Sequence, residues 1–191
     1  MKFAKADKLF DDGKESDWFY DDVMFAVENG LFNGTGDNKF SPNASMNRAM
    51  LVTVLYRLEG EPKVIGSSEF NDVAGGQWYT DAVIWATKNE IVNGYGNGKF
   101  GPTDNITREQ MATILFRYAQ FKKHDTAASN SLTGYSDFND ISVFSLKALK
   151  WANAEGLING RTTTTLAPQG TATRAEVAAI LHRFVENVVN K

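Results

Sequence analysis

The sequence predicts a mainly α-helical protein in which three tandem helix-loop-helix repeats pack as one compact, pseudo-threefold helical domain. Three observations predict this fold class. Landmark residues recur at one shared pair of intervals along the 191-residue chain. Each copy has an amphipathic helix, a loop marked by glycine and proline, and a second helix that begins with a cap. A copy of roughly 60 residues is too small to bury a sufficient core alone, so the copies must pack on one another.

The repeat is visible in the spacing of single residue types. Pro42, Pro102 and Pro168 are separated by 60 and then by 66 residues. The same two intervals separate four further sets of landmarks, which are Gly34, Gly94 and Gly160; Phe25, Trp85 and Trp151; Arg48, Arg108 and Arg174; and Arg57, Arg117 and Arg183. Five sets with one pair of offsets identify a tandem repeat. We place a single three-lobed domain over residues 1–191, with repeats at 3–60, 64–121 and 135–191 and a polar linker at 122–134.

The first helix of each copy is predicted from apolar periodicity. In copy one, Val23, Ala26 and Val27 share one face at i, i+3, i+4 spacing, and Gly30 follows as a stop signal. The expected first helices are Tyr20 to Asn29, Asp81 to Asn89, and Ser145 to Glu155 with Gly156 as its stop. Trp85 and Trp151 lie mid-helix among apolar residues and are expected in the core. Core packing is also the first interpretation of Trp18 and Trp78, but their place before a helix leaves a role at a binding surface open.

Each second helix is predicted from its cap. Thr107 with Gln110, and Thr173 with Glu176, fit the capping box, in which two side chains satisfy backbone N–H groups at the helix start. In copy one Asn47 can cap, but Met50 cannot complete the box. Asn-Gly pairs in the preceding loops permit positive φ, so we expect tight chain reversal there. The terminal copies are no more polar than the middle one, which favours closure over an open solenoid.

Composition excludes several classes of function. A net charge of −3 and a pI near 5.4 argue against nucleic-acid binding. No apolar run approaches the ~20 residues of a membrane span. The start of the chain, Met1 to Asp7, lacks the apolar stretch of a signal peptide, so the chain is either cytosolic or a piece of a longer secreted precursor. The absence of cysteine excludes disulfides and thiolate metal sites.

Two motifs and the histidines could suggest cofactor or metal sites, but their context does not support this. Gly96 to Gly101 spells a dinucleotide-binding fingerprint, yet it follows a helix rather than a strand. Asp37-Asn38-Lys39 lacks the acidic spacing of a calcium loop. His124 and His182 have no metal-ligand spacing. We therefore expect no cofactor and no metal.

The repeated motifs resemble those of the S-layer homology family. Copy two carries an aromatic-Asx-Asp start (Phe70-Asn71-Asp72), a Trp-Tyr pair, a Gly-x-Gly loop ending on Phe-x-Pro, and Thr107-Arg108-Glu109-Gln110 at a helix start. We match its start in copy three to Phe138-Asn139-Asp140 and in copy one to Phe10-Asp11-Asp12. The resemblance implies a three-lobed helical domain, usually at one end of an extracellular protein of the cell wall or S-layer. It implies binding of a secondary cell-wall polysaccharide, often one with a pyruvate ketal, in grooves between lobes.

The resemblance also implies the ligand-binding residues, with the arginine of the Thr-Arg-Ala-Glu motif central to them. A guanidinium offers a planar fork of donors to a carboxylate. From spacing alone, a solvated or ion-paired arginine is an equally good interpretation. The candidate residues are Arg48, Arg108, Arg174, Trp18, Trp78, Asn33, Gly34, Asn93, Gly94, Asn159 and Gly160. Arg57, Arg117 and Arg183, near helix ends, are assigned a structural role.

Departures from the family pattern predict unequal grooves. Copy three lacks the Trp-Tyr pair, and its loop lacks the second glycine. We expect the site that uses copy two's motif to be the most complete, so that Arg108→Ala weakens binding more than Arg174→Ala.

Two alternative functions are weighed against anchoring. One is a self-assembling surface lattice. The other is a wall-active glycoside hydrolase that uses carboxylates. The acidic candidates, Asp11, Asp12, Asp72, Asp137 and Asp140, recur with the repeat as turn and helix-start residues do, which argues against catalysis.

Overall fold

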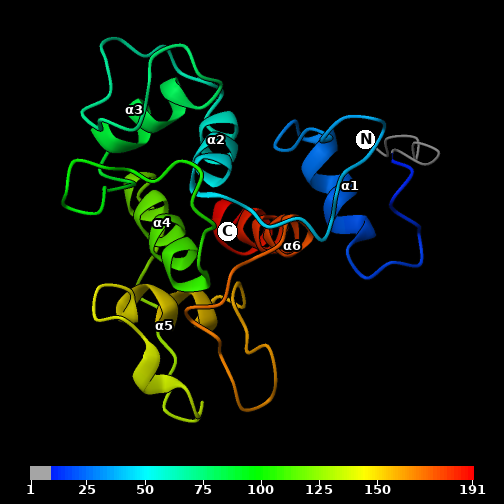
Figure 1. Ribbon diagram of the computed structural model, residues 1–191. Coiled ribbons are helices and arrows are strands. Elements are labelled where there is room, and N and C mark those ends of the chain that lie inside the picture. Colours follow the sequence, from blue (N-terminus) through cyan, green and yellow to red (C-terminus); the bar gives the residue numbers. More distant parts are fainter. Residues whose placement is uncertain (1–9) are drawn as a thin grey trace.

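The computed structural model describes residues 10–191, and within them the fold is built from six α-helices (Figure 1). Met1 to Asp7, and the first residues of the expected repeat 3–60, lie outside the described part. The α-helices are α1 (Tyr20–Glu28), α2 (Arg48–Leu58), α3 (Thr80–Lys88), α4 (Arg108–Phe121), α5 (Leu146–Ala154) and α6 (Arg174–Phe184). A 3₁₀ turn, η1 (Phe138–Asp140), precedes α5, and a π-helical turn, η2 (Val185–Val189), extends α6. Among these residues there are isolated β-bridges but no sheet.

The expected helices and caps are confirmed. Each first helix lies within one or two residues of its predicted bounds. The capping boxes of Thr107 with Gln110 and of Thr173 with Glu176 are both formed. Asn47 accepts from the N–H of Met50 at 2.8 Å, as a lone cap does. Gly30 and Gly156 follow α1 and α5 with φ of 69° and 71°, so both act as helix stops.

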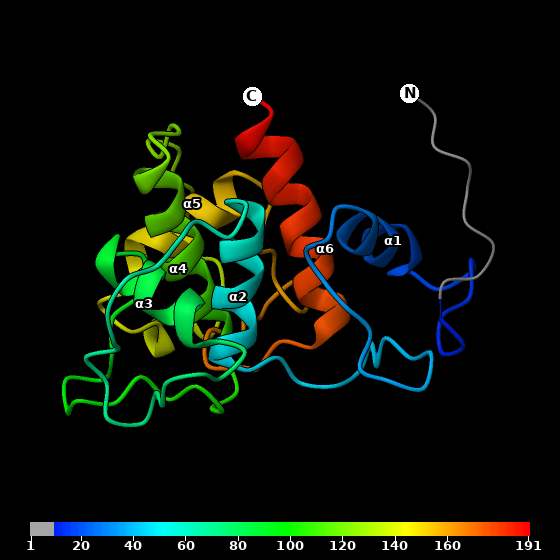
Figure 2. The ribbon, with the colours of Figure 1, turned by 90° about the horizontal axis from the view of Figure 1, so that it is seen from above.

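The lobes do not coincide with the repeats. The packed helix pairs are α2 with α3, α4 with α5, and α6 with α1. Each lobe therefore joins the second helix of one copy to the first helix of the next copy, and the last pair closes the circle. Figure 1 shows the second helices, α2, α4 and α6, gathered at the centre, with α1, α3 and α5 outside them. Figure 2 shows the same arrangement from above.

A ring of three backbone hydrogen bonds closes the domain at its centre. Met46 N–H donates to the carbonyl of Ala172 at 2.9 Å, Ala172 N–H to Ile106 at 3.3 Å, and Ile106 N–H to Met46 at 2.9 Å. These residues precede the three caps, and their side chains are fully buried. The expected compact, pseudo-threefold closure is thus confirmed.

The tryptophans divide into two sets. Trp85 and Trp151 are buried, as expected, and both pack against aromatic rings of the preceding second helix. Trp18 and Trp78 are 65% and 58% exposed, so core packing was the wrong first interpretation for both. Each lies edge-on against the next residue, Phe19 or Tyr79. Leu132, within the expected polar linker, is fully buried.

The start of copy three differs from the expected motif. The carboxylates of Asp12 and Asp72 each accept two loop N–H groups, from Phe40 and Ser41 or from Phe100 and Gly101. In copy three Asp137 does this, accepting from Leu166 at 2.9 Å and Ala167 at 2.7 Å. The motif is therefore Tyr135-Ser136-Asp137, and Phe138-Asn139-Asp140 instead forms η1. Asp12, Asp72 and Asp137 recur because each fixes the loop of its own copy.

The Asn-Gly glycines serve close packing rather than chain reversal. Gly34, Gly94 and Gly160 do not have positive φ, contrary to expectation. A Cβ at Gly34 would lie 2.7 Å from the ring of Phe10, and one at Gly160 would lie 2.7 Å from the ring of Tyr135. Glycine is needed there because an aromatic ring lies against the backbone.

Candidate ligand-binding grooves

Each motif arginine reaches into the loop of the next copy. Arg48 donates through Nε to the carbonyl of Phe100 at 2.8 Å and through Nη2 to that of Asn93 at 3.1 Å. Arg108 makes the same pair of bonds to Leu166, at 3.1 Å, and to Asn159. Arg174 completes the circle through Phe40 at 2.8 Å and Asn33 at 2.7 Å.

The side chains of the three arginines are buried. Their exposed fractions are only 5%, 5% and 6% for Arg48, Arg108 and Arg174. Burial lowers the pKa of each guanidinium below its ordinary value, although arginine still carries its charge at neutral pH. Within residues 10–191, Nη1 of each guanidinium makes no hydrogen bond. Each arginine thus braces a junction between copies and leaves its Nη1 without a hydrogen-bond partner among the described residues.

A cavity of about 340 Å³, which we name the Arg48 groove, opens beside the first of these guanidiniums. Its floor is Arg48 and the copy-two loop at Asn93 and Gly94. The other lining residues include Tyr95, Gln110, Thr113, Ile114, Arg117 and Phe144. Phe144 belongs to copy three and is 58% exposed. The groove therefore takes its arginine, its loop and helix, and its exposed aromatic ring from three different copies.

A second cavity, of about 290 Å³, is the Arg108 groove. Its lining residues are equivalent to those of the Arg48 groove, but each comes from the following copy, with copy one following copy three. Its floor is Arg108 and the copy-three loop at Asn159 and Gly160, and Trp18 of copy one is the exposed aromatic ring. The residues that face these from the loop and α6 include Arg161, Glu176, Ala179, Ile180 and Arg183.

The candidate residues are thus divided among three junctions. Arg48 lies with Asn93 and Gly94, Arg108 with Asn159 and Gly160, and Arg174 with the Asn33 loop. The motif of copy two is consequently shared between two grooves, since its arginine and its loop serve different ones. At the Arg174 junction the guanidinium carbon lies 4.5 Å from the ring centroid of Phe40 and 5.3 Å from that of Phe32. Trp78 is the residue equivalent to Phe144 and Trp18 by position in the repeat.

Sequence reasoning missed several lining residues. Arg117 and Arg183, assigned only a structural role, line the two grooves. Gln110 and Glu176, recognised only as capping residues, line them too. Gln110, Thr113 or Ile114, and Arg117 share one face of α4 by their i, i+3/i+4, i+7 spacing, which is a signal in the sequence. Phe144 carries no such signal because its partners come from other copies.

A buried carboxylate holds the segment that carries Phe144. Glu109 is 3% exposed and follows Arg108 at the start of α4. It accepts from Ser142 N–H at 3.0 Å and from the hydroxyls of Ser142 and Ser145 at 2.8 and 3.0 Å. Gln169 Nε2 donates to it at 2.8 Å. Copies one and three have alanine at this position, Ala49 and Ala175, so this clasp is particular to one junction.

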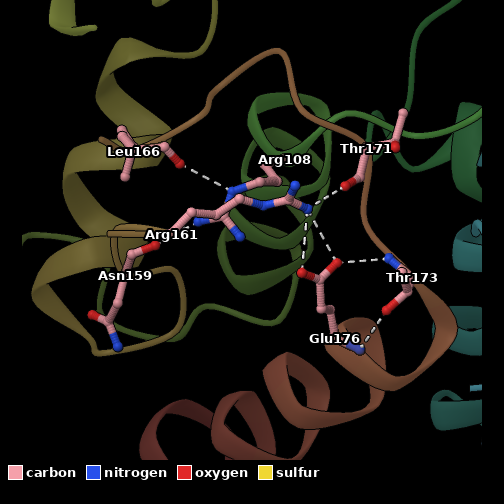
Figure 3. A network of polar contacts seen from close by, with 7 residues as sticks. All are labelled: Arg108, Asn159, Arg161, Leu166, Thr171, Thr173 and Glu176. Atoms are coloured by element: carbon pink, nitrogen blue, oxygen red, sulfur yellow. Dashed lines mark hydrogen bonds and ion pairs between the residues drawn. The ribbon is translucent and has the colours of Figure 1, made fainter. Parts of the chain in front are cut away.

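The grooves differ most where a loop residue faces the arginine. In the Arg48 groove the guanidinium carbon lies 4.7 Å from the ring centroids of both Tyr95 and Phe100. In the Arg108 groove these positions are Arg161 and Leu166 (Figure 3). Arg161 Nη2 donates to the carbonyl of Thr171 at 2.6 Å and pairs with Glu176 at 3.2 Å. After burial, the charge of Arg161 is the next cause that lowers the pKa of Arg108.

Between residues 10 and 191, no group of three or more histidine or acidic side chains is placed to hold a metal ion. None of the helices in this part is both long and apolar enough to span a membrane.

Comparison with known proteins gives one family. The model of the S-layer homology domain matches residues 9–49, 69–112 and 134–178, once in each copy. The three segments together cover more than half of the chain.

Individual relatives are much longer than this chain. It is 34% identical over 188 residues to an amylopullulanase of Thermoanaerobacterium thermosulfurigenes, a match covering 96% of the chain and 10% of the relative. It is 28% identical to a surface-layer 125 kDa protein of Lysinibacillus sphaericus, covering 97% and 16%. It is 25% identical to a cellulosome-anchoring protein of Acetivibrio thermocellus, covering 77% and 33%. The chain therefore spans between a tenth and a third of the length of these relatives.

Proposed function

This chain belongs to the S-layer homology domain family, and we propose that it binds an anionic secondary polysaccharide of the cell wall through its inter-lobe grooves. Members of this family serve in cell-surface anchoring, and the chain is accordingly an extracellular module of the cell wall or S-layer. Its attachment to a larger secreted protein is part of the proposal, supported by its small share of each relative.

One observation carries the proposal: each of the two grooves sets a buried guanidinium, whose Nη1 makes no hydrogen bond among the described residues, beside an exposed aromatic ring. An aromatic face suits the apolar face of a sugar, and the donor suits a carboxylate fixed to that sugar. A pyruvate ketal combines these two features in one residue of a polymer. The backbone of the Asn-Gly pair lines each groove beside the guanidinium.

Two other functions are less well supported. A glycoside hydrolase needs a pair of free carboxylates across a substrate. Asp12, Asp72 and Asp137 instead accept from loop N–H groups. This chain covers only 10% of the length of its amylopullulanase relative. A self-assembling lattice remains the alternative. Sedimentation at high protein concentration separates the two, since a lattice component polymerises and an anchor stays discrete.

The test is binding to purified wall sacculi. We expect the chain to sediment with sacculi that retain their secondary polymer and to stay in solution after hydrofluoric acid has removed that polymer. Val143→Ala is a suitable control variant, because Val143 is exposed and does not line either groove. Undiminished binding to stripped peptidoglycan would contradict the proposal.

The arginines provide a second test. We expect Arg108→Ala to weaken binding more than Arg174→Ala, because Arg108 lines a groove with Arg161 and Arg183 as further donors. Circular dichroism must first show that both variants are folded at the assay temperature, since both arginines brace junctions. The reverse order would refute this ranking of the grooves.

A further inference from the structure

The two grooves contain different residue pairs at equivalent positions. In the Arg48 groove the pair is Tyr95, whose hydroxyl donates to Asp104 at 3.0 Å, and Gln110. In the Arg108 groove the pair is Arg161 and Glu176, which form an ion pair. Both Gln110 and Glu176 also complete capping boxes. The second helix therefore begins in the same way in both grooves, while the wall beside the ligand changes from neutral to charged.

This exchange alters how each buried guanidinium is stabilised. Arg48 lies between two aromatic rings, whose faces attract a cation without adding net charge. Arg108 has Leu166 and Arg161 instead, so a second guanidinium lies beside it (Figure 3). Two adjacent cations repel each other, and an anion with more than one negative charge relieves this repulsion best.

Arg161 keeps most of its donors free for a ligand. Its contacts with Thr171 and with both oxygens of Glu176 all use Nη2. Glu176 in turn is engaged by the N–H of Thr173 at 2.7 Å. Among the described residues, Nε and Nη1 of Arg161 and Nη1 of Arg108 have no hydrogen-bond partner. Arg183 adds a third guanidinium to the same cavity.

A phosphoryl group fits this donor set better than a carboxylate does. A carboxylate has two oxygens in one plane, which a single guanidinium fork satisfies. A phosphate monoester has three acceptor oxygens and a charge near −2 at neutral pH. We propose that the Arg108 groove binds a phosphoryl group attached to a sugar, whereas the Arg48 groove binds a sugar carboxylate. Trp18, exposed on the wall of the Arg108 groove, supplies the face for that sugar. This inference rests on the proposed function.

Ligand binding in each groove can be measured separately in the intact chain through a backbone amide signal. Gly94 and Gly160 each lie on the floor of one groove, so their backbone N–H signals in ¹H–¹⁵N NMR spectra report on it. The probes are glucose 6-phosphate, a methyl hexoside with a 4,6-pyruvate ketal, and inorganic phosphate. We expect glucose 6-phosphate to shift Gly160 with roughly tenfold or higher affinity than the ketal does. The ketal should preferentially shift Gly94. Inorganic phosphate should bind at Gly160 more weakly than the sugar phosphate.

Exchanging the residue pairs provides the matched test. Arg161→Tyr with Glu176→Gln gives the Arg108 groove the neutral pair, and it keeps the cap because Gln110 already forms one in α4. This variant should lose the phosphate preference at Gly160. The reciprocal variant, Tyr95→Arg with Gln110→Glu, should bring a phosphate preference to Gly94. Thermal unfolding of both variants checks that the fold is retained.

The outcomes distinguish this inference from the proposed function. If glucose 6-phosphate shifts Gly94 and Gly160 equally, or the exchange leaves both preferences unchanged, the phosphoryl assignment is wrong even where sacculus binding persists. If inorganic phosphate binds at Gly160 as tightly as the sugar phosphate, the attached sugar is not part of the ligand and the assignment is again wrong. If no probe shifts either amide and the chain does not bind intact sacculi, the proposed function fails.

Discussion

The Arg48 groove and the Arg108 groove have the same supports and different linings. In both, a buried arginine donates to two loop carbonyls of the next copy. An aspartate carboxylate accepts hydrogen bonds from backbone N–H groups of the same loop. The lining changes from Tyr95, Gln110 and Phe144 to Arg161, Glu176 and Trp18. The supports recur because every junction needs them for closure. The residues that can select a ligand are the lining residues that differ between the two grooves, while the arginine and the aspartate stay the same.

The largest expected effect comes from removing a shared support. Arg48→Ala should lower the free energy of unfolding by about 3–4 kcal/mol, because the buried carbonyl of Phe100 and the partly buried carbonyl of Asn93 lose their charged donor. Arg108→Ala should cost roughly 1 kcal/mol less, since Arg161 and Leu166 stand at the positions of the two rings that face Arg48. Urea unfolding followed by circular dichroism measures both. Equal losses would mean that the linings do not affect the stability of the junctions.

A smaller effect is expected from removing the Glu109 carboxylate, which supports only the Arg48 groove. Glu109→Ala should destabilise the domain by about 2–3 kcal/mol, because four donors from Ser142, Ser145 and Gln169 lose a buried carboxylate acceptor. Since this segment carries Phe144, ketal binding reported by Gly94 should weaken while the response of Gly160 stays unchanged. Glu109→Gln, which keeps an acceptor oxygen, is the control and should have a milder effect. A matching loss at Gly160 would show that the grooves are coupled.

Asp72 and Asp137, which accept hydrogen bonds from the two loops, should each make the stability of the fold depend on pH. Burial alone would raise the pKa of Asp72, but N–H donors from Phe100 and Gly101 outweigh it, so this pKa lies below the ordinary value. Asp137 is lowered in the same way by Leu166 and Ala167.

The sign of the pH dependence follows from these lowered values. The unfolded chain takes up a proton at a higher pH than the folded chain does, so the stabilisation is complete above about pH 4 and is lost as pH falls through the lowered pKa. Asp72→Asn should cost about 1–2 kcal/mol at pH 7 and much less near pH 2. Melting temperatures from pH 7 to pH 2 measure this. A constant difference across that range would contradict the assignment.

The smallest expected effect is at the exposed aromatic ring. Phe144→Ala should weaken ketal binding in the Arg48 groove by about three- to tenfold and leave stability unchanged, because Phe144 is mostly exposed. Phe144→Trp should preserve binding, as Trp18 occupies the equivalent position in the Arg108 groove. Val143→Ala next to it should have no effect. Titrations that follow Gly94 decide the outcome, and an unchanged affinity for Phe144→Ala would remove the ring from the site.

Much of the fold could be predicted from the sequence because its signals are local. The caps at Thr107 and Thr173 and the stop at Gly30 depend on neighbours a few residues away. The start of copy three could not be placed this way, since Tyr135-Ser136-Asp137 and Phe138-Asn139-Asp140 are similar as sequences. The hydrogen bonds that distinguish them lie about 30 residues further along, at Leu166 and Ala167.

The candidate site was predicted only in part, for a similar reason. The motif arginines could be identified, but their partners could not, because each partner belongs to the following copy. Helical periodicity shows which face of α4 is apolar and does not show which copy covers it. Phe144 meets Arg48 and Tyr95 only after three copies have closed, so no spacing along the chain predicts their meeting.

The ring of Met46, Ile106 and Ala172 has a consequence for the order of events during synthesis. Its third member, and α6, which packs against α1, come from the last 20 or so residues of the chain. Until they leave the ribosome, α1 has no helix to cover its apolar face and the ring is open. Contacts between such distant segments form late and slowly. A chain truncated before residue 172 would therefore lack closure and would leave α1 without the helix that packs against it.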